Sequence, residues 1–313
     1  MSRSLLALYL ALIVAGLLAP LVGVYPVYLM TLYSFAIFAC AFNLLLGYGG
    51  MLSFGHAAYF GLGAYITSWL VTSAQWSTLP AIAMGMVAAL VAGFLIGLLA
   101  IRRSGIYFAM ITLALAQLVY FVCLQAPFTG GENGIQGVSR GTLFGLVSLK
   151  SDLAMYYFVF ALLVAVFLAI RRIVSSPFGQ VLKAIRENEP RAVSLGYDVN
   201  RYKLLVFVLS ATLAGLAGSL KALVLGFATL TDVLQATSGE VILMTLLGGA
   251  GTFLGPVVGA GIVVTLQDML SDRVGSWVTV IIGGIFVLCV LAFRKGVVGE
   301  LQAWIERRRT RPT

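Results

Sequence analysis

The residues best placed to do chemistry in this sequence are glycines that interrupt apolar runs. One such cluster contains Gly248, Gly249, Gly251 and Gly255, with Pro256 directly after it. Proline suits the first turn of a helix, because the N–H that it lacks would have no partner there. A helix starting at Pro256 would direct the positive end of its dipole into the apolar interior, where a carboxylate could bind. Packing alone is the alternative interpretation, because Gly251, Gly255 and Gly259 recur every four residues and small residues at that spacing let helices approach closely.

A second cluster, GYGGMLSFGH at residues 47–56, contributes Gly49, Gly50, Ser53 and His56 as candidate substrate-pathway residues. The flanking runs are each long enough to span a membrane, so a simple turn is an equal interpretation of these glycines. Ser53 is expected to cap the following helix, which places His56 in its first turn with either a structural or a gating role. Glu240 is the one acid at the edge of the first cluster, and it is either paired or part of a pathway.

Several kinds of enzyme site are missing from the sequence. No Gly-Lys dipeptide occurs, so there is no phosphate-binding loop of the GxxxxGK[ST] type, and the single histidine excludes HExxH. Cys40, Cys123 and Cys289 lie in apolar runs without metal-ligand spacing and are interpreted as buried hydrophobic residues. We therefore expect no catalytic residue, no metal and no cofactor bound by this chain.

Composition decides the class of protein. Of 313 residues, 61% are hydrophobic and 10% are charged, where soluble domains carry roughly 25% charged residues. The mean hydropathy is +1.04. A span needs about 20 apolar residues. The apolar runs that predict membrane-spanning segments are 5–23, 27–46, 54–73, 79–101, 105–124, 153–170, 204–225, 240–268 and 275–293.

The distribution of positive charge predicts the orientation. Most of the 20 Lys and Arg residues fall at the N-terminus, at 102–103, within 171–203 and in the tail 294–313, and positive loops face the cytoplasm.

To keep the tail inside, 240–268 is expected to be a re-entrant hairpin of two half-helices, 240–250 and 256–268. The predicted fold is an all-α polytopic integral membrane protein: a single domain, 1–313, of about eight transmembrane helices plus this hairpin, with both termini cytoplasmic. The net charge of +9 is attributed to loops that face anionic membrane lipid, not to nucleic acid.

The segment 172–203 is the one sizeable polar block on the predicted cytoplasmic side. Phe178, Leu182 and Ile185 have helical spacing, Pro190 breaks that helix, and Gly196 is a typical residue to close a second one. We therefore expect two short surface helices that dock a partner. A solvated charged loop is the alternative.

Five segments, taken in order, resemble the LivM-type permease subunits of branched-chain amino acid ABC importers. They are NLLLGYGGMLSFGHAAYFGLGAY at 43–65, GIYFAMITLALAQ at 105–117, TGGENGI at 129–135, the stretch 176–220, and 240–260. The resemblance covers roughly residues 25–295. Met51 and Lys221 depart from it, because the family usually has a polar Gln at the first position and an aromatic or apolar residue at the second.

The resemblance implies a multi-pass protein of the cell inner membrane that has no ATPase site of its own. Its implied partners are a LivH-type second permease, two cytoplasmic ABC ATPase subunits that bind the ATP, and an extracytoplasmic substrate-binding protein. Segment 176–203 is similar to the coupling loop of such importers. The residues that would then lie at the ATPase are Lys183, Arg186, Glu189, Arg191 and Gly196.

Other functions remain open at this point. An ion-coupled secondary carrier of small polar solutes would need acids or a sodium site within the membrane, and the predicted full spans contain no acid. A non-transporting assembly or channel subunit would leave the two-helix loop unexplained. The substrate is also open, since relatives of this family handle other amino acids or amides such as urea.

Overall fold

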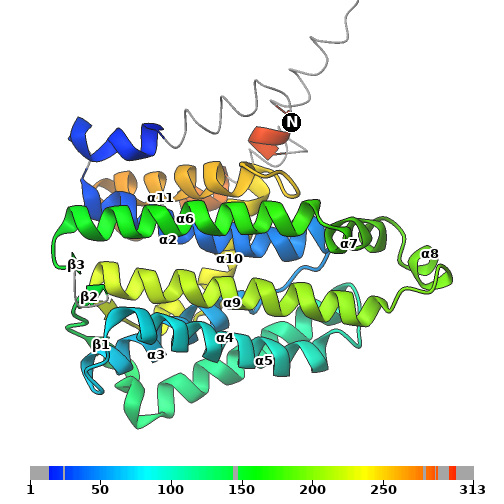
Figure 1. The fold of residues 1–313 in the computed structure, drawn as a ribbon, viewed down its shortest axis with the longest axis horizontal. Coiled ribbons are helices and arrows are strands. Elements are labelled where there is room, and N and C mark those ends of the chain that lie inside the picture. The colour runs from blue at the N-terminus through cyan, green and yellow to red at the C-terminus, as the bar shows by residue number, and fades with distance from the viewer. Residues whose placement is uncertain are drawn as a thin grey trace, which may run out of the picture.

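The computed structural model describes residues 14–23, 25–143, 147–277, 280–285, 287 and 296–300, and these are mostly helical (Figure 1). The long helices are α2 (Pro26–Asn43, continued by a π-turn, Leu44–Tyr48), α3 (His56–Thr72), α4 (Thr78–Ala100), α5 (Ile106–Gln125), α6 (Asp152–Ser175), α9 (Val199–Leu225), α10 (Gln235–Gly248) and α11 (Gly255–Val274). Two short helices, α7 (Pro177–Glu187) and α8 (Glu189–Ser194), lie between α6 and α9. Within the described residues, five of these helices (α2 with its π-turn, α4, α5, α6 and α9) are long and apolar enough to cross a membrane. The chain is therefore a polytopic membrane protein.

Two groups of helices meet along α2 and α9. One group consists of α2, α6, α10 and α11, and the other of α3, α4, α5 and α9 (Figure 1). Helices α3 and α9 approach closely, because a Cβ on Gly63 would overlap the backbone of Gly215 and one on Gly218 would overlap the backbone of Phe60. Small residues at such crossings allow van der Waals packing of the backbones, which drives helix association in lipid.

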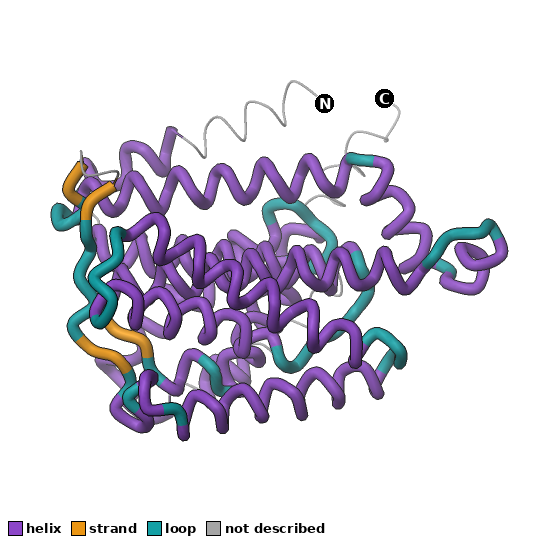
Figure 2. Tube along the Cα trace, turned by 60° about the horizontal axis from the view of Figure 1, so that its bottom comes forward, coloured by secondary structure: helices purple, strands orange, loops and turns teal. Residues whose placement is uncertain are grey.

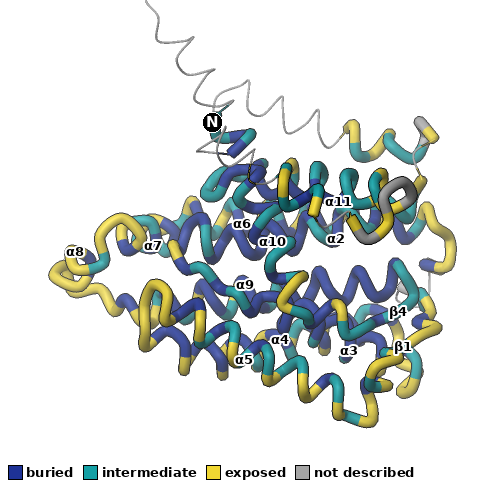
Figure 3. Tube along the Cα trace, turned by 180° about the vertical axis from the view of Figure 1, so that it is seen from behind, coloured by how far each residue is buried: buried dark blue, intermediate teal, exposed yellow. Residues whose placement is uncertain are grey.

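The outer helices keep apolar side chains exposed. Leu95 and Leu99 of α4 and Met110 and Leu118 of α5 are each more than half exposed, and Figure 3 shows exposed positions along both helices. Water-soluble proteins rarely expose apolar surface of this extent, whereas it is normal on helices that face hydrocarbon. It agrees with a bundle that is surrounded by lipid or by another membrane subunit.

The two ends of the bundle differ. Helices α7 and α8 project from one end, called here the α7 end (Figure 1, right). The opposite strand end holds two small antiparallel sheets, β1 (Ile135–Gln136) with β4 (Phe227–Ala228) and β2 (Thr142–Leu143) with β3 (Val147–Ser148). The TGGENGI segment lies at this end and leads into β1, with Gly130, Gly131 and Gly134 at positive φ.

Helix α3 does not run the length of the bundle. Its first residue, His56, is hydrogen-bonded to Ser210, the twelfth residue of the parallel helix α9, so α3 begins about halfway along the bundle. The preceding segment, 49–55, is non-helical and returns from the α7 end to this level. The glycines at 47–55 are therefore more than a turn between two full spans.

Helix α10 also begins near the middle, since Ser238 in its second turn accepts a hydrogen bond from the N–H of Ala57 at the start of α3. The chain then turns at 249–254 beside the C-terminal end of α2, where the N–H of Gly251 donates to Asn43. The prediction that this turn stays inside the bundle is wrong. The segment between α9 and α10 leads from the strand end to the middle of the bundle, and α10 carries the chain from there to the α7 end.

Helix α11 is likewise longer than the predicted 256–268. It has 20 residues, or about 30 Å at 1.5 Å per residue, and runs antiparallel to α2, with Thr265 beside Tyr28. Pro256 lies in its first turn, as expected. The predicted segments 5–23 and 275–293 lie partly outside the described residues. Of the predicted tail 294–313, residues 296–300 are described and the others lie outside.

Candidate functional site

Local sequence explains the two short helices at the α7 end. Ser176 accepts a hydrogen bond from the N–H of Gly179 and caps α7, and Asn188 accepts one from the N–H of Arg191 and caps α8. Leu182 and Ile185 of α7 are buried. The expectation of two helices with an apolar stripe is confirmed, and Figure 2 shows the pair projecting beyond the other helices. The break lies at Asn188, because Pro190 occupies the first turn of α8.

Gly196 follows α8 with φ +86°. A backbone in this left-handed region favours glycine, and a Cβ added here would meet no atom within 4 Å. The predicted role of Gly196 in closing the second helix is therefore a matter of backbone conformation alone.

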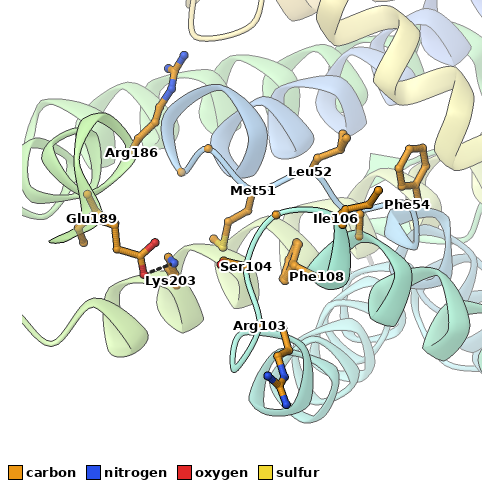
Figure 4. Close-up of a pocket in the computed structure, with 15 residues that line it drawn as sticks. Met51, Leu52, Phe54, Arg103, Ser104, Ile106, Phe108, Arg186, Glu189 and Lys203 are labelled. Atoms are coloured by element: carbon orange, nitrogen blue, oxygen red, sulfur yellow. Dashed lines mark hydrogen bonds and ion pairs between the residues drawn. The ribbon is translucent and has the colours of Figure 1, made fainter. Parts of the chain in front are cut away.

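A cavity of about 530 Å³ opens beside these helices (Figure 4). Its walls come from the 49–54 segment, the start of α5, the helices α7 and α8, and the start of α9. The lining residues include Gly49, Gly50, Met51, Leu52, Phe54, Arg103, Ser104, Phe108, Arg186, Glu189 and Lys203. The predicted pathway residues Gly49 and Gly50 thus share one cavity with the predicted docking residues Arg186 and Glu189. The cavity reaches Phe54, two residues before α3 begins.

Two charged residues of the cavity, Glu189 and Lys203, form an ion pair. Lys203 Nζ lies 2.6 Å from Glu189 Oε1, and the Lys203 side chain is only 9% exposed (Figure 4). Within the chain this carboxylate holds α8 against α9, and the contact of Glu189 with an ATPase stays a prediction. Arg191 and Gly196 are exposed.

Helix α7 also contacts the end of α2. Arg186 donates a hydrogen bond to the carbonyl oxygen of Gly47, and Lys183 Nζ lies 5.8 Å from the centre of the Tyr48 ring. The Arg186 side chain lies against Gly50, where a Cβ would come within 2.9 Å of Arg186 Cγ. Two of the predicted docking residues are thus in direct contact with the glycine cluster at 47–56.

Ser53 and His56 lie deeper and face protein. Ser53 accepts a hydrogen bond from the N–H of Gly55, which is itself the N-cap residue of α3. The prediction that Ser53 caps this helix is wrong, since the helix starts three residues later.

His56 is completely buried, with the aromatic rings of Phe38, Phe42, Tyr59 and Phe207 around it. Because Ser210 donates its hydroxyl hydrogen to the carbonyl of Ala41, its oxygen accepts from His56 Nε2. These contacts make His56 a connection between α2, α3 and α9.

The glycine cluster at 248–255 is closely packed. A Cβ on Gly248 would overlap the carbonyl of Gly255, and one on Gly255 would lie 2.6 Å from the Gly249 carbonyl. Gly251 lies in the turn and faces Gly47 and Arg186, so it does not share a helix face with Gly255 and Gly259 as the four-residue spacing suggested. Glu240 accepts a hydrogen bond of 3.1 Å from Gln267 of α11.

Sequence reasoning missed Asn43 and Lys203 as residues of this region. Asn43 is 2% exposed. The signal that could have revealed it is a lone amide in an apolar run, because such a group needs hydrogen-bond partners in the membrane. Lys203 was visible only as one of many cations in its loop.

Comparison with known proteins identifies the family. Residues 25–291 match the family described as branched-chain amino acid transport system / permease component. The chain is 31% identical over 283 residues to the high-affinity branched-chain amino acid transport system permease protein LivM of Escherichia coli K12, covering 82% of this chain and 66% of that protein. It is 24% identical to a probable LivM of Methanocaldococcus jannaschii, covering 84% and 90% of the two chains.

A third relative is the autoinducer 2 import system permease protein LsrC of Salmonella paratyphi B, 27% identical over 71% of this chain and 63% of that protein. The chain thus spans just under two thirds of the E. coli and LsrC relatives. No solved structure matches it. Since the family match covers most of the chain, the chain belongs to the family of permease components of branched-chain amino acid transport systems.

Proposed function

We propose that this protein is the membrane-spanning permease subunit of an ABC importer that moves branched-chain or related amino acids, driven by ATP hydrolysis on partner subunits. The observation that carries the proposal is the contact of α7 with the glycine cluster at 47–56, through Arg186 and Gly47, in a chain of this family. It supplies a physical route from a docked ATPase to the wall of a cavity. The proposed partners are a second permease, two ATPases at α7 and α8, and an extracytoplasmic binding protein.

The direct test is uptake of radiolabelled leucine, isoleucine and valine into proteoliposomes that contain the whole transporter. We expect uptake to require ATP inside, the ATPase subunits and the binding protein. Uptake by this chain alone, driven by an ion gradient, would establish an ion-coupled carrier and refute the proposal. Co-purification of the ATPases is the supporting measurement.

The substrate needs its own competition assay. LivM relatives are named for branched-chain amino acids and the LsrC relatives for autoinducer 2, and the LivM of Escherichia coli has a higher identity to this chain (31%) than LsrC of Salmonella paratyphi B (27%). Unlabelled leucine is therefore expected to compete, whereas autoinducer 2 and urea are not. Competition by one of these two alone would reassign the substrate and leave the importer mechanism in place.

For the orientation, we propose that the α7 end is cytoplasmic and that both termini are cytoplasmic. The cations near that end, among them Arg102, Arg103 and Arg172, support it through the positive-inside rule. The α10–α11 hairpin enters from the outside, reaches the α7 end and returns to the outside, so the chain leaves it on the side on which it entered. A Thr310→Cys variant should resist an impermeant thiol reagent in intact cells and react after permeabilisation. Ready labelling of intact cells would overturn this topology.

For the substrate pathway, we propose that the cavity along 49–54 forms its cytoplasmic half. Leu52 lines the cavity, whereas Leu99 is exposed on α4, away from it. In inside-out vesicles, a thiol reagent should abolish uptake by Leu52→Cys and spare Leu99→Cys. Equal sensitivity of the two variants, or none in either, would contradict the proposal.

A further inference from the structure

Asn43 connects the two glycine clusters. Its side-chain nitrogen donates to the carbonyl of Thr252 at 2.9 Å, and its side-chain oxygen accepts from the N–H of Gly251 at 2.8 Å. One buried amide therefore satisfies two backbone groups of the α10–α11 turn. The Asn43 amide is itself buried and needs these two partners, which makes the arrangement specific in both position and direction.

The surrounding residues fit this bridge. A Cβ on Gly47 would overlap both Asn43 Oδ1 and the Gly251 backbone nitrogen, so glycine at 47 is what lets the turn approach α2. Gly251 has φ +83°. Beside it, the rings of Tyr48 and Phe253 lie 5.7 Å apart, which adds an apolar contact between the same two segments.

Helix α7 contacts the same unit from the other side. Arg186 donates to Gly47, and its Nη1 lies 3.2 Å from where a Cβ on Gly251 would be. Gly47 and Gly251 therefore each contact both Asn43 on α2 and Arg186 on α7. Segments about 200 residues apart in the sequence form one packed layer at the α7 end.

We propose that Asn43 is a positioning residue for transport: it joins the turn after α2 to the α10–α11 turn, so that both move as one body with α7. This inference rests on the proposed coupling role of α7. Its physical basis is that rigid, packed elements transmit displacement, whereas a loose contact absorbs it. Without the bridge, α7 would displace the end of α2 and leave α10 and α11 behind.

The first test measures leucine transported per ATP hydrolysed by the whole transporter in proteoliposomes; if competition identifies another amino acid, that one replaces leucine. Asn43→Ala and Asn43→Asp should lower this ratio several-fold while ATP hydrolysis continues. Asp retains the acceptor for Gly251 and loses the donor to Thr252. The matched control is Ser34→Ala, since Ser34 is equally buried on α2 and bonds only to Met30 of its own helix. A purely structural role would reduce the amount of protein and leave the ratio unchanged, which would overturn the proposal.

The second test replaces the bridge by a covalent one. In a background without the three native cysteines, Tyr48→Cys and Phe253→Cys are joined by a bifunctional thiol reagent that a reductant cleaves, because the 5.7 Å contact is between ring centres that shorter side chains do not reach. Because the two segments are proposed to move together, the cross-linked transporter should retain uptake, and the cross-link should restore the ratio in Asn43→Ala. Loss of uptake on cross-linking, regained with reductant, would show that the segments separate during transport and would overturn the proposal.

The two proposals fail in different ways. If Gly196→Val uncouples the transporter and both Asn43 variants keep the normal ratio, α7 acts without this bridge. If Gly196→Val leaves coupling normal as well, the coupling role of α7 itself is refuted.

Discussion

Lys221 of α9 and Asp232 of the segment before α10 form a buried ion pair near the strand end of the bundle. Lys221 Nζ lies 2.8 Å from Asp232 Oδ1, and both side chains are 7% exposed. The lysine also lies 4.5 Å from the centre of the Phe227 ring, and Asp232 accepts a hydrogen bond from the N–H of Thr229. The acid lies 11 residues along the chain from the lysine and neutralises its charge within the buried pair. The pair fixes the segment through which the chain descends to α10.

Breaking this pair should destabilise the protein. Lys221→Met leaves the Asp232 carboxylate buried without its cation, which costs about 3–5 kcal/mol, so the thermal unfolding midpoint in detergent should fall markedly. Lys221→Met combined with Asp232→Asn should recover part of that loss. Lys150→Met, at an exposed lysine of the same end, serves as the control and should unfold as the parent does. An unchanged midpoint for Lys221→Met would mean that the pair contributes nothing to stability.

The conformation of Gly196 predicts a graded effect on coupling. Valine at this left-handed position costs roughly 1–2 kcal/mol and should change the end of α8, so uptake should fall steeply while the binding protein still captures substrate. Asparagine tolerates the left-handed region, so Gly196→Asn should stay close to the parent. The readouts are uptake and substrate-stimulated ATP hydrolysis in the same vesicles. Normal uptake and ATP hydrolysis in Gly196→Val would show that the α7–α8 segment is only a solvated connection.

The ion pair between Glu189 and Lys203 predicts rescue by charge exchange. Glu189→Lys places two cations together and leaves Lys203 without its partner in a largely buried position. That change should loosen α8 at a cost near 3 kcal/mol and reduce substrate-stimulated ATP hydrolysis. Adding Lys203→Glu should restore much of it. If the exchange rescues nothing, Glu189 acts on a partner subunit directly, as the sequence alone had suggested.

The glycine turn predicts a contrast along α11. Leucine at Gly251 or Gly255 would meet backbone atoms, and overpacking costs typically 1–3 kcal/mol; both variants should insert in the membrane and lose uptake. Gly261→Leu is the matched control, because a Cβ there meets no atom within 4 Å, and it should transport normally. Normal uptake in Gly251→Leu and Gly255→Leu would show that the close contact is dispensable.

The amino-acid sequence determined the class of this protein and its helical segments. Hydropathy is a local property, and an apolar run of about 20 residues must form a helix in lipid, because every backbone N–H and C=O needs a partner within the segment. The boundaries of α4 and α5 therefore lie within one residue of the runs at 79–101 and 105–124, whereas α6 starts one residue before the run at 153–170 and ends five residues after it. The two helices around Asn188 were also predictable, since caps, prolines and glycines act within a few residues of themselves.

Tertiary structure alone decided where the chain leaves these helices and which residues meet. Nothing local shows that α3 starts halfway along the bundle, because its depth is set by contacts with α9 and α10. Asn43 binds the Gly251 turn across 208 residues of sequence, and Lys221 is buried only because Asp232 folds back onto it. Partners of buried polar groups are chosen by the packing of whole helices, so composition shows that such a group needs a partner and the fold determines which one it has.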